Sequence, residues 1–183
     1  MAGHSHWTQI KRQKAITDAK RSKLFSKAIK IIAVAARDGS DPNFNPKLKS
    51  ALEKAKEINL PKENIEKAIK RGIGRAEGAG LEEVLYEAYG PGGVALILVG
   101  ITDNRNRASQ EIKHILQENG AKMVPPGSVS FLFEKIEGEF RPRNPMSGIA
   151  SEDKEKLKKI FEALDEHEDI QEIYSNLAED IGY

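Results

Sequence analysis

The 183-residue chain contains no cysteine. Disulfide bonds, thiolate zinc sites, iron–sulfur clusters and cysteine nucleophiles are therefore excluded. Long apolar runs are also missing, because no stretch approaches the roughly 20 apolar residues that a membrane-spanning helix needs. The first residues, MAGHSHWTQIKRQK, have neither the apolar core nor the cleavage site of a signal peptide. We expect a cytoplasmic protein with no membrane partner.

Motifs for catalysis are missing as well. The sequence has no HExxH motif, no recognisable pair of nucleophile and base, and no two carboxylates framed by glycines. His4 and His6 are two residues apart, but no third ligand accompanies them, so we expect no metal site. The segment GPGG at 90–93 lacks the lysine and hydroxyl residue of a P-loop, and it is typical of a tight turn. We expect no enzyme activity and no cofactor.

Charged residues are abundant and unevenly divided. Residues 1–75 contain 18 Lys and Arg but 7 Asp and Glu, a net charge of +11, whereas residues 76–183 carry −10. A strongly basic segment favours a polyanionic partner. Two alternatives stay open: the halves attract each other, or the charges only keep the surface solvated.

The basic half has the periodicity of helices. Between residues 22 and 37, apolar residues recur at steps of three and four, and most cations fall on the opposite side of the helical wheel. A second helix is predicted to start after the capping residue Asn45. A third is predicted to start after Pro61 and to end at Gly72. We therefore expect a basic helical domain at 1–75.

The pattern changes after the glycine-rich stretch 72–80, which we interpret as a linker. The predicted elements that follow are strands at 84–89 and 94–99, a helix at about 105–119, a strand at 128–133, a connection at 138–150, a helix capped by Ser151 and a strand at 170–174. Residues 76–183 thus form an acidic domain. The expected fold class is α+β: an N-terminal helical domain, then a small α/β domain with a mainly antiparallel sheet and two helices.

Several motifs occur in a fixed order. They are Gly3-His4-Ser5, Trp7, Ile10-Lys11, Lys14, Asp18, Lys20-Arg21, Lys23, Phe25, Lys27, Tyr89-Gly90-Pro91-Gly92-Gly93 and Asp103-Asn104-Arg105-Asn106-Arg107. Over most of residues 1–134 the chain closely resembles the YebC family, and the segment 170–176 resembles that family's end. The resemblance implies a helical first domain and an α/β second domain, into which family members usually insert a third domain. We expect that insert to be missing here, with 138–150 in its place.

The resemblance also implies a regulator of gene expression. Bacterial members are described as probable DNA-binding transcriptional regulators, whereas some bacterial relatives and the mitochondrial relative act in translation with the ribosome. The implied partner is DNA or ribosomal or messenger RNA. A helix rich in lysine favours backbone contact over base reading, which favours RNA or the ribosome. A protein–protein adaptor is the alternative from another class. No coiled-coil heptad demands self-association, so a monomer is favoured.

The candidate nucleic-acid-binding residues are cations near the start of the chain and at one later helix start: Lys11, Arg12, Lys14, Lys20, Arg21, Lys23, Lys27, Lys30, Arg105 and Arg107. Neutralising several phosphates with such a set would release condensed counterions. Trp7 could stack on a base or belong to the core. The two arginines could hold a phosphate at a helix N-terminus, or they could pair with glutamates such as Glu87 or Glu111.

Overall fold

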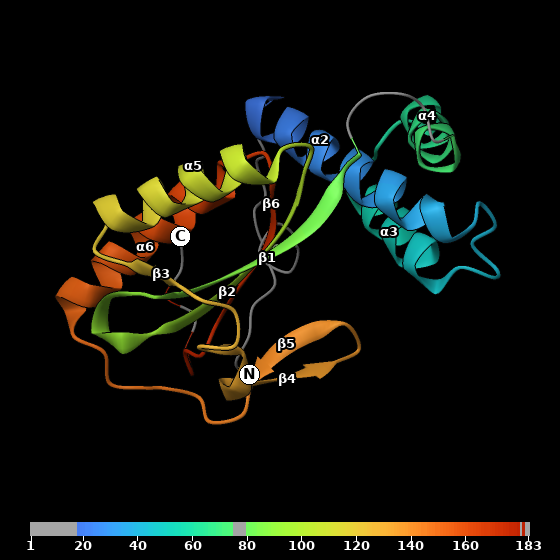
Figure 1. Cartoon of the computed structure of the whole chain (residues 1–183). Coiled ribbons are helices and arrows are strands. Elements are labelled where there is room, and N and C mark those ends of the chain that lie inside the picture. The colour runs from blue at the N-terminus through green and yellow to red at the C-terminus, as the bar shows by residue number, and fades with distance from the viewer. Residues whose placement is uncertain (1–17, 75–79, 180, 182–183) are drawn as a thin grey trace. The chain divides into compact units, whose positions relative to one another are not determined.

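The computed structural model describes residues 18–74, 80–179 and 181 (Figure 1). These residues fall into two compact units: a helical unit up to Glu83 together with Ile101–Asn104, and a sheet unit of Val84–Gly100 and the residues from Arg105 onward. The predicted fold class is confirmed, because helices precede a small antiparallel sheet with two further helices. None of the helices in the described ranges is long and apolar enough to cross a membrane.

Among the described residues of the helical unit, the first helix is also the longest. Its elements are α2 (Asp18–Ala35), the 3-10 turn η1 (Ala36–Asp38), α3 (Pro46–Glu57) and α4 (Lys62–Ile73). The predicted cap of α3 is confirmed, because Oδ1 of Asn45 accepts a hydrogen bond of 3.0 Å from the backbone N–H of Leu48. The side chains of Ile32 and Leu48 are fully buried, as the helical period of three and four residues requires of an inward face.

Gly72 does not end α4, contrary to the prediction. The helix continues to Ile73, and Gly74 is its C-cap. A Cβ atom at Gly72 would collide with the carbonyl oxygen of Ala33 and with Cβ of Ala36. The missing side chain therefore lets α4 approach α2 closely. The first residues of the predicted 72–80 linker are accordingly helical, and residues 75–79 lie outside the described part of the chain.

The sheet unit is built on two hydrogen-bonded sheets. The four-stranded sheet has the order β3-β1-β2-β6, and the other sheet pairs β4 with β5. The elements are β1 (Glu82–Tyr89), the turn η2 (Pro91–Gly93), β2 (Ala95–Thr102), α5 (Arg105–Glu118), β3 (Lys122–Val124), η3 (Ser130–Leu132), β4 (Phe133–Ile136), β5 (Glu139–Pro142), α6 (Ser151–Asp165) and β6 (Ile170–Ser175). As predicted, the apolar run at 94–99 forms a central strand.

Both faces of the four-stranded sheet are covered. Figure 1 shows α5 and α6 on one face and the β4–β5 hairpin on the other. The helix side holds the larger core, in which Leu96 and Leu98 pack with Ile112 and Ile160. The hairpin side holds a smaller core that includes Ala95, Ile97, Val129, Phe133 and Tyr174. The two-sided burial of β2 explains why its sequence shows no alternation of apolar and polar residues.

The predicted strand at 128–133 is wrong in its first part. Val129 and Phe133 are buried, but Phe131 lies in the 3-10 turn η3 and is 65% exposed. The reason is the buried carboxylate of Glu87, which accepts the backbone N–H groups of residues 127, 129 and 130 at 2.8, 2.6 and 3.2 Å. These donors are bound to a side chain, so they are not available for a strand ladder.

Two other predictions in this unit need correction. The 138–150 connection is not irregular throughout, because its first residues form β5, which pairs with β4. Ser151 is the first residue of α6, and Ala150 is the N-cap, with no side-chain cap hydrogen bond. The turn between β4 and β5 requires left-handed backbone at Glu137 and Gly138, with φ of 52° and 90°. A turn that contains only one glycine is hard to recognise in a sequence.

Candidate nucleic-acid interface

The candidate cations at the start of the chain are only partly within the described residues. Lys11, Arg12 and Lys14 lie outside them, and so does Trp7. On α2, the side chains of Lys20 and Arg21 are exposed, and those of Lys23 and Lys30 are half-buried. Arg21 lies 3.8 Å from the exposed carboxylate of Asp18. An exposed pair of this kind contributes little free energy, so a phosphate could replace the carboxylate.

Lys27 does not lie on an open surface, contrary to the prediction. Its side chain is buried, at 2% exposure, like those of Leu24 and Ala28 beside it on the helix. The helical wheel puts Lys27 among the other cations, but a wheel describes one isolated helix. Burial depends on what packs over α2 in the folded chain. A buried ammonium cannot contact a phosphate in solvent, so Lys27 is not part of the candidate interface.

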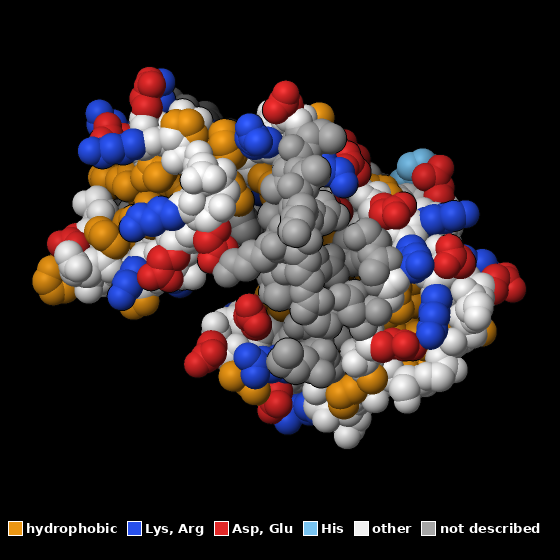
Figure 2. Space-filling view, turned by 180° about the vertical axis from the view of Figure 1, so that it is seen from behind, with side chains coloured by type: hydrophobic (Ala, Val, Ile, Leu, Met, Phe, Trp, Pro, Cys, Tyr) orange, Lys and Arg blue, Asp and Glu red, His pale blue; other side chains and the backbone are white. Residues whose placement is uncertain are grey.

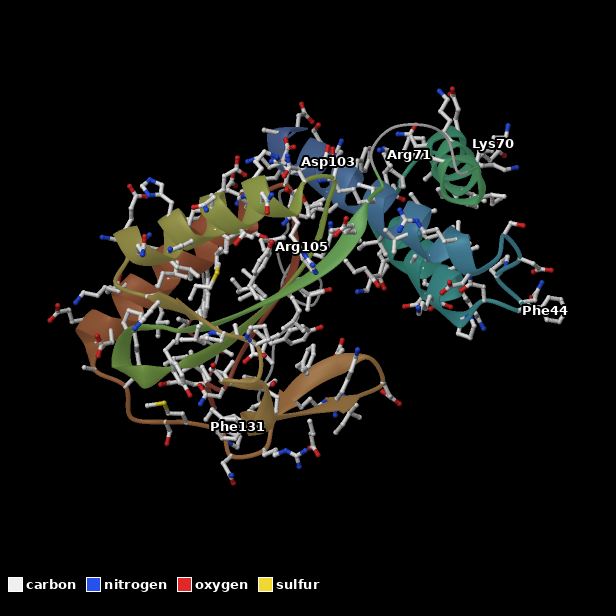
Figure 3. The ribbon with its side chains drawn as sticks, in the orientation of Figure 1. Phe44, Lys70, Arg71, Asp103, Arg105 and Phe131 are labelled. Atoms are coloured by element: carbon white, nitrogen blue, oxygen red, sulfur yellow. The ribbon has the colours of Figure 1, made fainter. Side chains whose placement is uncertain are left out.

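Further exposed cations lie on α4, where the sequence singled out no site. Lys67 forms an ion pair of 2.6 Å with Glu63, but Lys70 and Arg71 form none with the described carboxylates. Figure 3 shows both side chains projecting from the last part of α4. Cations are common in the last turn of any helix because they stabilise its dipole. For this reason their sequence position alone did not indicate a ligand.

Arg107 is bound to carboxylates. Its Nη1 lies 3.2 Å from Oε2 of Glu111, and its Nη2 donates to Oδ2 of Asp169 at 2.9 Å. Glu111 is one of the two partners that the sequence offered, whereas Glu87 binds backbone N–H groups instead. The Asp169 carboxylate is buried. The structure therefore favours the carboxylate alternative for Arg107 over phosphate binding.

Three side chains near Arg107 have the composition of a metal site. Ligand atoms of Glu111, His167 and Asp169 lie within 4.8 Å of one another. However, Nδ1 of His167 accepts the backbone N–H of Asp169, which leaves Nε2 to donate to Glu111 at 3.0 Å. Both carboxylates also bind Arg107. A cation would have to displace the guanidinium, so the cluster is better explained as a hydrogen-bonded ion network.

Arg105, labelled in Figure 3, is the first residue of α5 and is exposed. Arg105 acts electrostatically on Tyr86, whose buried hydroxyl has no hydrogen-bond partner among the described residues. Burial raises the pKa of Tyr86, Arg105 opposes that shift, and Asp169 adds to it. The position of Arg105 at a helix start keeps it compatible with an anion.

The charge of the helical unit is positive within the described residues too. The helices of this unit, residues 18–74, contain 14 Lys and Arg and 7 Asp and Glu, a net charge of +7, and its other described residues add Glu82, Glu83 and Asp103, which brings the unit to +4. On the face that Figure 2 shows, basic and acidic side chains are interspersed. Several acids pair with neighbouring cations, as Asp38 does with Lys47 at 3.0 Å. The cations thus form separate contact points rather than one unbroken field.

Comparison with known protein families gives two matches along the chain. The family model described as the TACO1/YebC protein N-terminal domain matches residues 5–75. The model described as the TACO1/YebC second and third domain matches residues 81–137. Together they take in most of the chain, in the order in which the helical and sheet units occur.

Individual relatives agree with these matches. A probable transcriptional regulatory protein from Fervidobacterium nodosum is 36% identical over 236 residues, which take in 96% of this chain and 93% of the relative. A protein with the same description from Persephonella marina is 56% identical over 136 residues, 74% of this chain but 54% of the relative. The 236-residue alignment is longer than this chain, so that relative has residues with no counterpart here.

A solved structure has the same fold. The crystal structure of a conserved hypothetical protein from Aquifex aeolicus is 34% identical to this chain and superposes with a TM-score of 0.85. The superposition takes in 98% of this chain and 100% of the other.

Proposed function

Since the chain belongs to the TACO1/YebC family, we propose that it is a nucleic-acid-binding regulator of gene expression that grips the phosphate backbone through its helical unit. The observation that carries the proposal is the net charge of +7 over residues 18–74, with exposed cations on α2 and α4. The names of the relatives, which are probable transcriptional regulatory proteins, support the same role.

The contacts that we propose are electrostatic. On α2, the exposed Lys20 and Arg21 and the half-buried Lys23 and Lys30 present charge that can neutralise phosphates. On α4, the exposed Lys70 and Arg71 do the same. Each neutralised phosphate releases condensed counterions, so binding would weaken steeply as salt rises and would tolerate many sequences. Lys11, Arg12 and Lys14, which lie outside the described residues, stay candidate contacts from the sequence alone.

RNA is favoured over a specific DNA site by the type of cation. Base reading in a major groove relies on Arg, Asn and Gln aimed at base edges, whereas lysine acts as a point charge on phosphate. Four of the five cations on α2 from Lys20 to Lys30 are lysines. Shape and backbone recognition of this kind suits structured RNA. A role in translation is therefore the version that we favour, with transcriptional control as the alternative.

We further propose that the 138–150 connection stands where relatives have an additional domain. The match to the second and third domains stops at residue 137, and the alignment with the Fervidobacterium nodosum relative is longer than this chain. Backbone hydrogen bonds hold the connection at two points along its length. Arg143 donates its backbone N–H to Leu132 at 2.8 Å, and Met146 exchanges backbone hydrogen bonds with Asn176 and Ala178 at 2.6 and 2.7 Å. The sheet unit is thereby closed without an insert.

A binding titration of the full chain tests the proposal. Fluorescence anisotropy would follow binding to a labelled RNA hairpin and a labelled DNA duplex, each in two unrelated sequences, at a series of salt concentrations. We expect log K to fall linearly with log salt and to change little between sequences. Absence of salt-dependent binding to both nucleic acids would contradict the proposal and favour a protein–protein adaptor.

A further inference from the structure

Phe44 is the most exposed of the large apolar side chains in the described ranges. It is 89% exposed, compared with 65% for Phe131 and 53% for Ile73. Figure 3 shows it at the tip of the loop between η1 and α3, pointing away from the helices. A phenylalanine ring in water forgoes the free energy that burial would supply. Folding of the helical unit therefore does not account for this ring.

The loop that presents Phe44 is fixed on both sides. Before it, Oδ1 of Asp41 accepts the backbone and side-chain N–H groups of Asn43, both at 2.9 Å, and the backbone N–H of Phe44 donates to the carbonyl of Asp41 at 3.1 Å. After it, the buried side chain of Asn45 donates to the carbonyls of Ala35 and Gly39 at 2.7 and 2.8 Å. The ring is thus held in solvent, and little backbone entropy would be lost on binding.

Cations follow the ring directly. Lys47 and Lys49 lie in or next to the first turn of α3 and are exposed, and that turn contains no acid. The helix dipole disfavours cations at this position, so helix stability does not explain them. Lys47 pairs with Asp38 at 3.0 Å, but both side chains are exposed, so the pair contributes little free energy and a phosphate could replace the carboxylate. A flat apolar ring beside fixed positive charge suits a ligand with aromatic faces and phosphates.

We propose that Phe44 is a stacking platform for an unpaired nucleobase, with Lys47 and Lys49 on the adjoining phosphates. This inference rests on the nucleic-acid binding proposed above and specifies its form: a single strand or a loop. Bases inside a duplex already stack on each other, so a ring on a fixed loop can reach only a base that is out of the stack. The site lies on the same helical unit as the candidate interface.

The test compares Phe44→Ala with Phe131→Ala in the full chain. Phe131 is also an exposed phenylalanine, but it lies in the acidic sheet unit, so it is the matched control. The probes are a single-stranded RNA that contains 2-aminopurine, whose fluorescence reports stacking, and a fully paired RNA duplex of the same length. Phe44→Tyr, which keeps the ring, is the conservative variant. Thermal unfolding checks that all variants keep the wild-type stability, as expected for exposed positions.

We expect Phe44→Ala to weaken single-strand binding about fivefold to 150-fold, the range for one base–aromatic stack, and to abolish the 2-aminopurine signal. Phe44→Ala should leave duplex binding and the salt slope near wild type. Phe44→Tyr and Phe131→Ala should bind the single strand about as tightly as the wild type does. Equal losses on single strand and duplex would overturn the inference in favour of a wedge between base steps. Unchanged binding by Phe44→Ala would overturn it while leaving the proposed function intact. Absence of nucleic-acid binding by the wild type would overturn both.

Discussion

Nη2 of Arg107 lies 2.9 Å from Oδ2 of Asp169, a carboxylate whose side chain is 2% exposed, and this ion pair ties the start of α5 to the turn before β6. Arginine suits the position because its planar fork also reaches Glu111 at 3.2 Å. The pair stands at a helix start, where a sequence alone equally suggests an anion site. In the folded chain the anion is a carboxylate of the protein itself.

Arg107→Ala should therefore act on stability. Removing the guanidinium takes a partner from a buried carboxylate, and because Arg107 itself is half exposed we expect a loss of about 2–3 kcal/mol, at or below the lower end for buried pairs. Urea unfolding measures the change, with Lys113→Ala on the exposed side of α5 as the control. A variant of unchanged stability but flatter salt dependence of nucleic-acid binding would show that Arg107 binds phosphate instead.

Glu87→Gln should destabilise the sheet unit at neutral pH. Burial raises the pKa of Glu87, but its three backbone hydrogen bonds outweigh this and keep the pKa below the ordinary value. An amide retains one acceptor oxygen, so we expect a loss of about 1–3 kcal/mol from the donors left unpaired. Urea unfolding at pH 7 measures it.

The same carboxylate predicts a pH dependence. Because the pKa of Glu87 is lower in the folded than in the unfolded chain, its stabilisation is complete above the unfolded value of about 4.3 and is lost as pH falls through the folded value. The difference in unfolding free energy between wild type and Glu87→Gln should narrow as pH falls below about 5. A difference that is constant down to pH 3 would contradict this role.

Gly72→Ala should destabilise the helical unit. Alanine is the better helix former by about 1 kcal/mol, but its Cβ would press on the backbone of Ala33, so α4 must move away from α2. We expect a net loss of about 1–3 kcal/mol from this overpacking. Gly80→Ala is the control, because no atom lies within 4 Å of a Cβ there. A Gly72→Ala protein that melts higher than wild type would show that the close approach of α4 to α2 does not need a glycine at this position.

The sequence predicted those features that depend on local periodicity and capping. The helical period gave α2, α3 and α4, Asn45 gave the start of α3, and the apolar run at 94–99 gave the central strand. These follow from interactions within a few residues along the chain.

The errors have a common physical origin in contacts between distant residues. Glu87 reaches backbone donors about 40 positions later and converts a predicted strand into a turn that exposes Phe131. Gly72 has the same sequence signal as a helix-ending glycine, yet it serves the packing of α4 on α2. On a helical wheel Lys27 falls on the polar side of α2, but in the folded chain its side chain is buried. No one-dimensional pattern records such neighbours.

The central claim is that cations of the helical unit bind phosphate. Its most direct test replaces Lys20, Lys23 and Lys30 together by glutamine, with the exposed lysines Lys113, Lys122 and Lys159 of the sheet unit replaced together as the matched control. Circular dichroism confirms folding, and the slope of log K against log salt is measured for an RNA hairpin and a DNA duplex. If each α2 lysine contacts one phosphate, the slope should flatten by up to about 2–3 units, while the control keeps the wild-type slope. A folded α2 variant with wild-type affinity and slope would contradict the account.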